Sequence, residues 1–142
     1  GSAEPKATCI LAHSGAAVQV QDCRVAAAGK AVLATDVDTR VTVAGLHVDQ
    51  AYRGVSVKDG ATAHLKPGCQ LLNCKVGISA EGSGSAVIAE QCAANMCVDG
   101  GFTASHGGSI VCTGCAVQGG DGAGFRAAAK GCLELREGCS VT

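Results

Sequence analysis

Apolar and small residues return at an interval of 23 residues along most of the chain. Counting from Cys69 in steps of 23, with one residue inserted before the last member, gives one column of positions: Cys23, Leu46, Cys69, Cys92, Cys115 and Cys139. Two positions after each comes another apolar or small residue: Val25, Val48, Leu71, Ala94, Val117 and Val141. This alternation predicts a short β-strand with one buried face, repeated once per interval.

Two further columns keep the same phase. The second contains Cys9, Val32, Val55, Ile78, Phe102 and Phe125, followed two residues later by Leu11, Ala34, Val57, Ala80, Ala104 and Ala127. The third contains the pairs Val18/Val20, Val41/Val43, Ala63/Leu65, Ala86/Ile88, Ile110/Cys112 and Leu133/Leu135. Tight turns such as "KDGAT" and "EGSGS" separate the strands. Three short strands per repeat of about 23 residues predict an all-β fold, a single-stranded parallel β-helix of about six coils. A β-sandwich with accidental spacing is the alternative.

The glycine-led segments of the second column carry a family resemblance. "GVSV", "GISA", "GFTA" and "GFRA" resemble the repeats of the pectate-lyase-like parallel β-helix superfamily, in the style of the non-catalytic β-helix domains of eukaryotic F-box and Shc-binding proteins. The resemblance implies a right-handed helix. We expect residues 1–8 to be a tag remnant and lead-in, and residues 9–142 to form the β-helix domain, a fragment of a larger protein.

The composition limits the size of the core side chains and the classes of partner. Aromatic residues are 2% and charged residues 16% of the chain, while 21 residues are glycine, so Ala, Val and Cys must fill a narrow core. The formal net charge is −1, without a basic run, which argues against nucleic-acid binding. No apolar stretch approaches the roughly 18 residues that a membrane span needs, so we expect no membrane contact.

Most of the ten cysteines fall in the predicted buried columns. Cys74 and Cys97 form a further column with Ala28, Ala51 and Gly120, and we interpret all of these thiols as small buried hydrophobes. Disulfides between stacked thiols and a zinc site at the C-x-x-C of Cys112 and Cys115 are the alternatives. Free thiols indicate a reducing, cytoplasmic or otherwise intracellular location. Cys132 lies in a turn, and we expect it to be an exposed, reactive thiol.

Candidate chemistry is sparse. Enzymes of the resembled superfamily carry Asp or Glu clusters on long loops, whereas the turns here are short. The best acidic cluster is Asp36, Asp38 and Asp59, with His13 expected in the same slot one coil earlier. Such a row could hold a cation or an acid/base pair, but Asp is favoured in solvated turns, and we prefer that interpretation. We therefore predict no catalytic residue, no metal and no cofactor.

The predicted outward positions favour contact with proteins. Val87, Val111, Ala93, Ala116 and Val141 make the later coils flat and weakly apolar, which suits an interaction surface. We predict a non-enzymatic scaffold or protein-interaction module with an unidentified protein partner. The alternative is a β-helix that binds or processes carbohydrate. Open terminal coils could also stack end to end into a homo-oligomer, with Val141 or Cys9 near the join.

Overall fold

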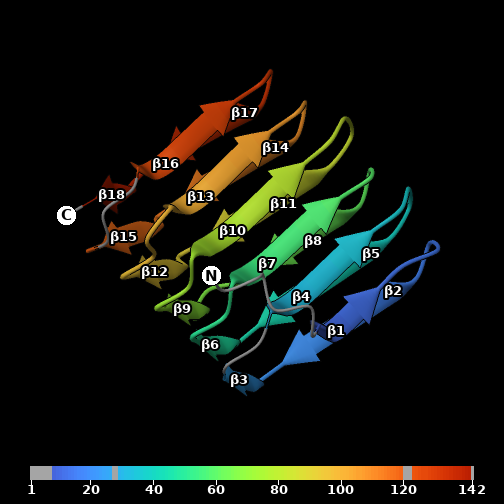
Figure 1. The fold of residues 1–142 in the computed structure, drawn as a ribbon, viewed down its shortest axis with the longest axis horizontal. Coiled ribbons are helices and arrows are strands. Elements are labelled where there is room, and N and C mark those ends of the chain that lie inside the picture. The colour runs from blue at the N-terminus through green and yellow to red at the C-terminus, as the bar shows by residue number, and fades with distance from the viewer. Residues whose placement is uncertain (1–7, 27–28, 120–122, 142) are drawn as a thin grey trace, which may run out of the picture.

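The chain forms a rod of stacked coils. The structure, a computed structural model, describes residues 8–26, 29–119 and 123–141, and this part of the chain contains eighteen β-strands and no helix. The successive coils stack side by side along the rod (Figure 1). Every strand pairs in parallel with the corresponding strand of a neighbouring coil. The predicted parallel β-helix is therefore confirmed, while the expected tag and lead-in, except for Thr8, lie outside the described residues.

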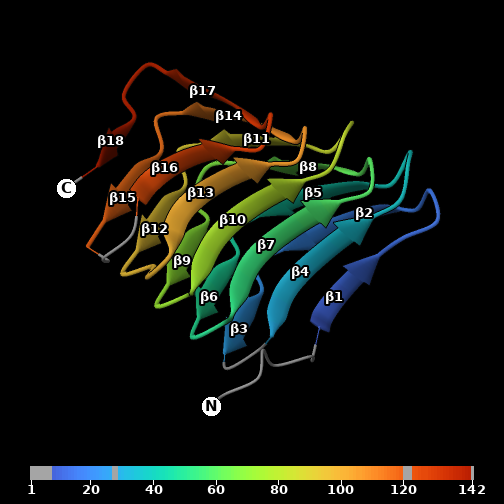
Figure 2. The ribbon, with the colours of Figure 1, turned by 45° about the horizontal axis from the view of Figure 1, so that its top comes forward.

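Each coil contributes one strand to each of three six-stranded sheets. Sheet A contains β1 (Thr8–Ala12), β4 (Lys30–Thr35), β7 (Arg53–Lys58), β10 (Val76–Glu81), β13 (Gly100–Ser105) and β16 (Ala123–Ala128). Sheet B contains β2 (Ala17–Gln21), β5 (Arg40–Ala44), β8 (Thr62–Leu65), β11 (Ala86–Glu90), β14 (Ser109–Thr113) and β17 (Cys132–Arg136). Sheet C contains β3 (Arg24–Ala26), β6 (His47–Asp49), β9 (Gln70–Leu72), β12 (Ala93–Asn95), β15 (Ala116–Gln118) and β18 (Ser140–Val141). Figure 2 shows sheet A arching in front of sheet B, with the short strands of sheet C beside them.

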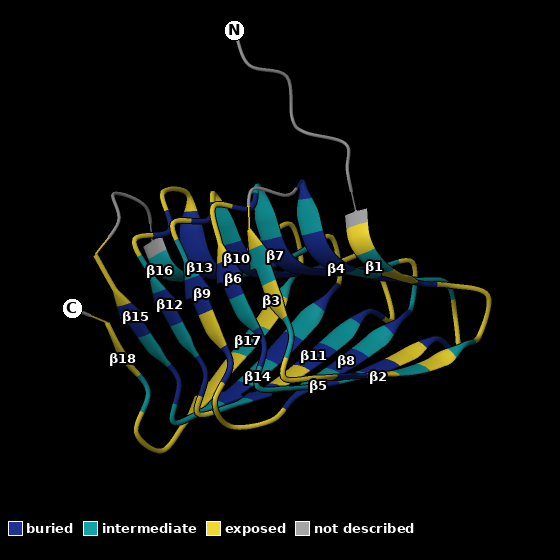
Figure 3. Cartoon of the chain, turned by 90° about the horizontal axis from the view of Figure 1, so that it is seen from below, coloured by how far each residue is buried: buried dark blue, intermediate teal, exposed yellow. Residues whose placement is uncertain are grey.

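The predicted columns form the core. In sheet A, Ile78 pairs with Val55 on one side and with Phe102 on the other, and all three are fully buried. The rings of Phe102 and Phe125 stack with their centroids 5.1 Å apart. Figure 3 shows buried residues along the middle coils and exposed residues gathered at turns and on the terminal coils. Each apolar side chain thus packs on its counterpart one coil away, and this stacking fills the narrow interior.

Close approach of the coils explains the glycines that lead four strands of sheet A. A Cβ atom added to Gly54 would lie 2.5 Å from the carbonyl oxygen of Gly77 and 2.9 Å from a methyl group of Leu71. A Cβ atom at Gly77 would meet the carbonyl oxygen of Gly101 at the same distance. Contacts this short are not tolerated, so only glycine fits where sheets C and A meet in these coils.

One strand of sheet B lies one residue out of the predicted register. In β11, Val87 pairs with Ala63 and Ile110 in the buried column, and Ile88 faces outward. Val87 is 1% exposed and Ile88 is 42% exposed, so the prediction that Val87 points outward was wrong. The turn before β11, residues 82–85, is one residue longer than the turns before β8 and β14. That extra residue shifts the parity of the strand that follows, and a shift of one residue exchanges its two faces.

A similar shift affects the first coil. Ile10 pairs with Val32 and Ala12 pairs with Ala34, so the prediction that Cys9 and Leu11 occupy this buried column was wrong. Ala12 is buried, whereas Cys9 and Leu11 are exposed. The path from Ala34 to the start of β5 is one residue longer than the path from Ala12 to the start of β2, which accounts for the offset.

Candidate functional site

The outer face of sheet B carries an apolar patch on neighbouring coils. Ile88 of β11 pairs in register with Val111 of β14, and both side chains point away from the core. Ile88 therefore takes the outward place that the sequence assigned to Val87. The same outward row continues with His64 on one side and Glu134 on the other. Exposed apolar groups on rigid strands are suited to contact with another protein surface.

Polar side-chain pairs border this patch at both ends. His64 Nε2 lies 3.3 Å from Glu90 Oε1, and Arg136 Nη2 donates a hydrogen bond to Glu134 Oε2 at 3.1 Å. Both pairs are substantially exposed, so they add little to stability. An apolar centre inside a polar, charged border is the usual anatomy of a protein-binding surface. We name Ile88, Val111 and these two polar pairs the sheet B patch.

The other residues predicted for the interaction surface lie elsewhere. Ala93 and Ala116 pair with each other on the outer face of sheet C, in a row with Gln70 and Ser140. Val141 belongs to an inward column, because it pairs with Val117, and it is exposed in the last coil. The predicted single surface is therefore divided among three places. End-to-end stacking through Val141 or Cys9 stays a prediction.

The acidic turns follow the strands of sheet A. Ser14, not His13, shares the slot of Asp36, because Ala12 aligns with Ala34. The backbone N–H of Ser14 donates to Asp36 Oδ2 at 2.9 Å, and Thr35 Oγ1 donates to Asp59 Oδ2 at 2.9 Å. Each of the two carboxylates thus ties its turn to the turn of the preceding coil.

The conformation of these turns also accounts for the acidic residues. Asp36, Asp38 and Asp59 all have positive φ angles, of 82°, 68° and 56°. Asp is one of the few side chains that tolerate this left-handed conformation, because it can hydrogen-bond locally. No three His, Cys, Asp or Glu side chains lie close enough to hold a metal ion in the part of the chain that the structure describes. A structural role for these carboxylates is thus the interpretation that the contacts support.

The column thiols lie inside the rod. Cys69, Cys74, Cys92, Cys97, Cys112 and Cys115 are buried, and Cys23 and Cys139 are half-buried. Ala51 is buried in the same column as Cys74 and Cys97, while Ala28 and Gly120 lie outside the described residues. Cys115 Sγ donates to the carbonyl of Ala89, and Cys139 Sγ donates to that of Cys112, both at 3.4 Å. The predicted packing of these thiols as buried small side chains is confirmed.

Neighbouring thiols change one another's acidity. A hydrogen bond between the side chains of Cys112 and Cys115 raises the pKa of Cys112, and burial raises it further. The same hydrogen bond lowers the pKa of Cys115, and this effect outweighs the opposing effect of burial. Hydrogen bonds with Cys115 and Cys69, together with burial, raise the pKa of Cys92. All ten cysteines are free. Cys132 is exposed, as predicted, and Cys9 is a second exposed thiol that the sequence analysis missed.

The outer face of sheet A carries polar contacts between neighbouring strands. Arg53 Nη1 donates to Ser79 Oγ at 3.3 Å, and Ser79 Oγ donates to Ser56 Oγ at 3.4 Å across neighbouring strands. Both serines are buried although they point away from the core. The alternation of Ser56 and Ser79 with Val55 and Ile78 placed them outside, but no sequence signal shows that they are covered.

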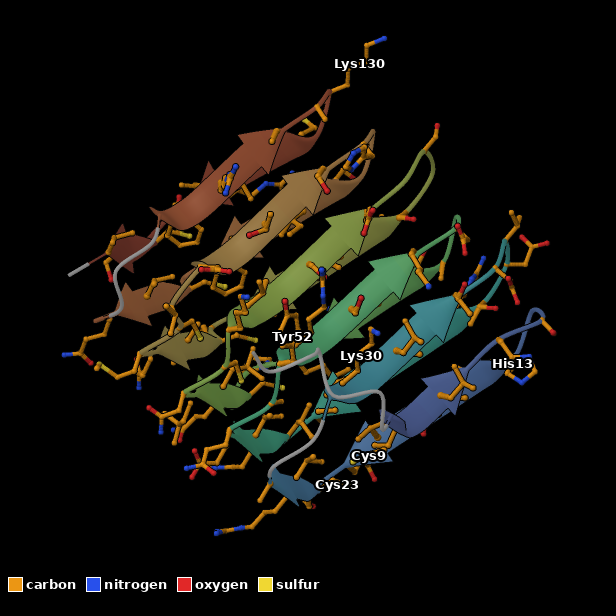
Figure 4. All side chains as sticks on the ribbon, in the orientation of Figure 1. Cys9, His13, Cys23, Lys30, Tyr52 and Lys130 are labelled. Atoms are coloured by element: carbon orange, nitrogen blue, oxygen red, sulfur yellow. The ribbon has the colours of Figure 1, made fainter. Side chains whose placement is uncertain are left out.

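Two shallow hollows lie on the surface near sheet C. The first, of about 310 Å³, lies over β3, β6 and β9 and is lined chiefly by Arg24, His47, Asp49 and Leu72. The second, of about 330 Å³, lies at the corner between sheets C and A, beside Tyr52 and Lys75. Figure 4 shows Tyr52 on one of the middle coils, near Lys30. Neither hollow was predicted from the sequence, because each combines residues from neighbouring coils.

Comparison with protein families agrees with this architecture. A family model described as a right-handed β-helix region matches residues 3–139. Searches of curated proteins and of solved structures gave no match. The finer resemblance to F-box and Shc-binding proteins stays a prediction. Among the described residues, none belongs to a helix that is long and apolar enough to cross a membrane.

Proposed function

The chain belongs to the right-handed β-helix family, and on that premise we propose that it is a non-enzymatic interaction module that binds a protein partner through the sheet B patch. One observation carries the proposal: Ile88 and Val111 stand side by side on the outside of a regular parallel sheet, between the polar pairs His64–Glu90 and Glu134–Arg136. A rigid sheet loses little conformational entropy on binding, which favours affinity.

The acidic turns give less support to polysaccharide processing. Asp36 and Asp59 accept hydrogen bonds from the preceding coil, so both carboxylates have a structural use without any substrate. A glycosidase-type site needs two carboxyl groups that face one scissile bond. We also propose a reducing, intracellular location, which the ten free thiols support.

The proposal is tested with charge substitutions on the patch and a matched control. Ile88→Lys and Val111→Lys each place an ammonium in the apolar centre, whereas Val37→Lys changes a valine that is 69% exposed in the turn after β4. Proteins captured from cells by the parent and by Val37→Lys, but lost with both patch variants, would be partners of this surface. We expect at least about tenfold weaker binding of such a partner, because a charge is desolvated at the centre of the contact.

The same variants can also contradict the proposal. A partner that binds Ile88→Lys and Val111→Lys as tightly as the parent would show that another surface carries recognition. A glycan-array signal that disappears in the double variant Asp36→Asn and Asp59→Asn would favour the carbohydrate alternative instead. Unchanged melting temperatures are expected for Ile88→Lys, Val111→Lys and Val37→Lys, because these three side chains point away from the core.

A further inference from the structure

The hollow at the corner between sheets C and A is suited to be a second binding site. It holds about 330 Å³ and lies between the turns of three successive coils, lined by Gln50, Ala51, Tyr52, Asn73, Lys75 and Val98. We propose that this hollow binds an acidic segment of a partner protein, with a carboxylate received by Lys75. This site is separate from the sheet B patch, and the inference does not depend on that patch.

The turns that build the hollow are held in register by the backbone. The N–H of Lys75 donates to the carbonyl of Ala51 at 3.2 Å, and the N–H of Val98 donates to the carbonyl of Cys74 at 3.1 Å. Tyr52, Lys75 and Val98 therefore project from successive coils. Because the coils fix the floor, a ligand would find the site largely formed in advance.

The ammonium group of Lys75 is fixed above this floor. Its Nζ atom lies 4.8 Å from the centroid of the Tyr52 ring and 3.6 Å from Asp99 Oδ2. Interactions with Tyr52 and Asp99 raise the pKa of Lys75, so the group stays charged at neutral pH. The side chain of Lys75 remains nearly half exposed. A charged donor that is positioned by neighbours and open to solvent is suited to an incoming carboxylate.

Two more cationic residues stand on neighbouring strands of sheet A. Arg53 follows Tyr52 directly in the chain, and Arg53 pairs in register with Lys30 of the preceding coil. In Figure 4 the labelled side chains of Lys30 and Tyr52 lie near each other on neighbouring coils. Lys30, Arg53 and Lys75 thus belong to three successive coils, and Arg53 Nη1 also donates to Ser79 Oγ. Two carboxylates oppose them: Asp99 pairs with Lys75, and Asp49 accepts from Asn73 Nδ2 at 3.1 Å. Complementary charge of this kind attracts an acidic ligand and orients it.

The apolar neighbours favour a peptide over an acidic sugar. Val98, which is 52% exposed, stands in the turn between β12 and β13 and supplies aliphatic surface to the hollow. One face of the Tyr52 ring is already occupied by the ammonium group, so that face cannot stack on a sugar ring. In a peptide, an acidic residue would pair with the ammonium group of Lys75, and an aliphatic residue next to it would cover Val98.

The experiment measures binding of a defined probe to the full chain. The probe is a fluorescein-labelled octapeptide of alternating Glu and Leu, followed by fluorescence anisotropy at low salt, with a Gln–Leu octapeptide as the uncharged comparison. We expect Lys75→Met to weaken binding about fivefold, the effect of an exposed ion pair. The matched control Lys66→Met removes an exposed lysine from another part of the surface and should leave the affinity unchanged.

A gain of affinity provides the sharper result. Asp99→Asn removes the internal competitor for Lys75, so it should tighten binding of the Glu–Leu peptide, a result that misfolding cannot imitate. Equal losses in Lys75→Met and Lys66→Met would overturn the proposal, as would equal binding of the Gln–Leu peptide or weaker binding by Asp99→Asn. Tighter, Lys75-dependent binding of polygalacturonate than of peptide would overturn the choice of a peptide. Ile88→Lys should leave peptide binding intact, which separates this result from the test of the sheet B patch.

Discussion

Inward and outward residues of sheet A lie one position apart on the same strands. Val55, Ile78 and Phe102 face inward, and they stack as apolar side chains from coil to coil. Ser56 and Ser79 face outward on two of those strands, where they form hydrogen bonds to each other and to Arg53. Sheet B shows the same division, with Val87 and Ala89 inside and the apolar Ile88 outside.

The difference shows which constraint governs each side. An inward side chain must fit against its counterparts at the strand spacing of about 4.8 Å, so the inward positions stay apolar or small from coil to coil. Outward positions hold side chains as different as Ser79 and Ile88 on the same regular strands, so their chemistry can change without disturbing the coil. The interior therefore determines the architecture, and the exterior rows determine what the rod can bind. Paired substitutions inside and outside the rod test this division.

The largest difference is expected between two valines changed to the same acid. Val55→Asp places an unpaired charge in the core and should lower the free energy of unfolding by about 4 kcal/mol or more. Val37→Asp changes an exposed turn residue and should stay within about 0.5 kcal/mol of the parent. Urea denaturation followed by circular dichroism measures both. Equal stability of the two variants would show that the inward column is assigned incorrectly.

A smaller difference is expected between neighbouring leucines of β9. Leu71 is fully buried against Gly54, so Leu71→Ala should leave a cavity and cost about 2–5 kcal/mol. Leu72 points outward and borders the hollow beside Asp49, so Leu72→Ala removes fewer contacts and should cost less than about 1.5 kcal/mol. The same urea titration compares them. A larger loss for Leu72→Ala would contradict the face assignment of sheet C.

The sequence predicted the interior well where apolar and polar residues alternate. The strand of Val55 and Val57, with Ser56 between them, permits only one parity, and the structure follows it. The prediction failed at "AVIA", residues 86–89, and at "CILA", residues 9–12, where all four residues are apolar. In such strands either face could be buried, so parity depends on the length of the neighbouring turns. Turn length varies here by one residue, and a fixed interval of 23 does not detect it.

The binding surfaces were less accessible to sequence analysis. The sheet B patch was predicted in part, through Val111, but its other half was assigned to Val87 instead of Ile88. The hollow beside Tyr52 and Lys75 was not predicted at all. Its residues come from turns, where side-chain direction follows from positive φ angles at positions such as Gln50 and Asn73 and not from a period of two.

Two serines in one turn provide a smaller test of inside against outside. Ser85 is buried, and its Oγ accepts from the Gly60 N–H at 2.9 Å and donates to the Glu81 carbonyl at 2.8 Å. Ser85→Ala leaves both backbone groups without this partner and should cost about 1–3 kcal/mol. Ser83 is exposed in the same turn, so Ser83→Ala should change stability by less than about 0.5 kcal/mol. Matching losses would mean that the Ser85 hydroxyl does not tie the coils together.

The smallest perturbation changes no residue of the core and compares thiols by their reactivity. Cys9 and Cys132 are exposed, whereas the other eight thiols are buried or half-buried, so a neutral thiol reagent should label two cysteines quickly in the native protein. Complete unfolding in denaturant without reductant should make all ten available. In the double variant Cys9→Ser and Cys132→Ser the fast phase should disappear while the slow phase keeps its rate, because slow labelling requires the coils to open. Fast labelling of Cys92 or Cys115, located by peptide mapping, would show that the interior is open to solvent.

A Cys69–Cys92 bridge recovered without added oxidant would contradict the proposed reducing location, since thiols stacked in adjacent coils remain unpaired only where nothing oxidises them.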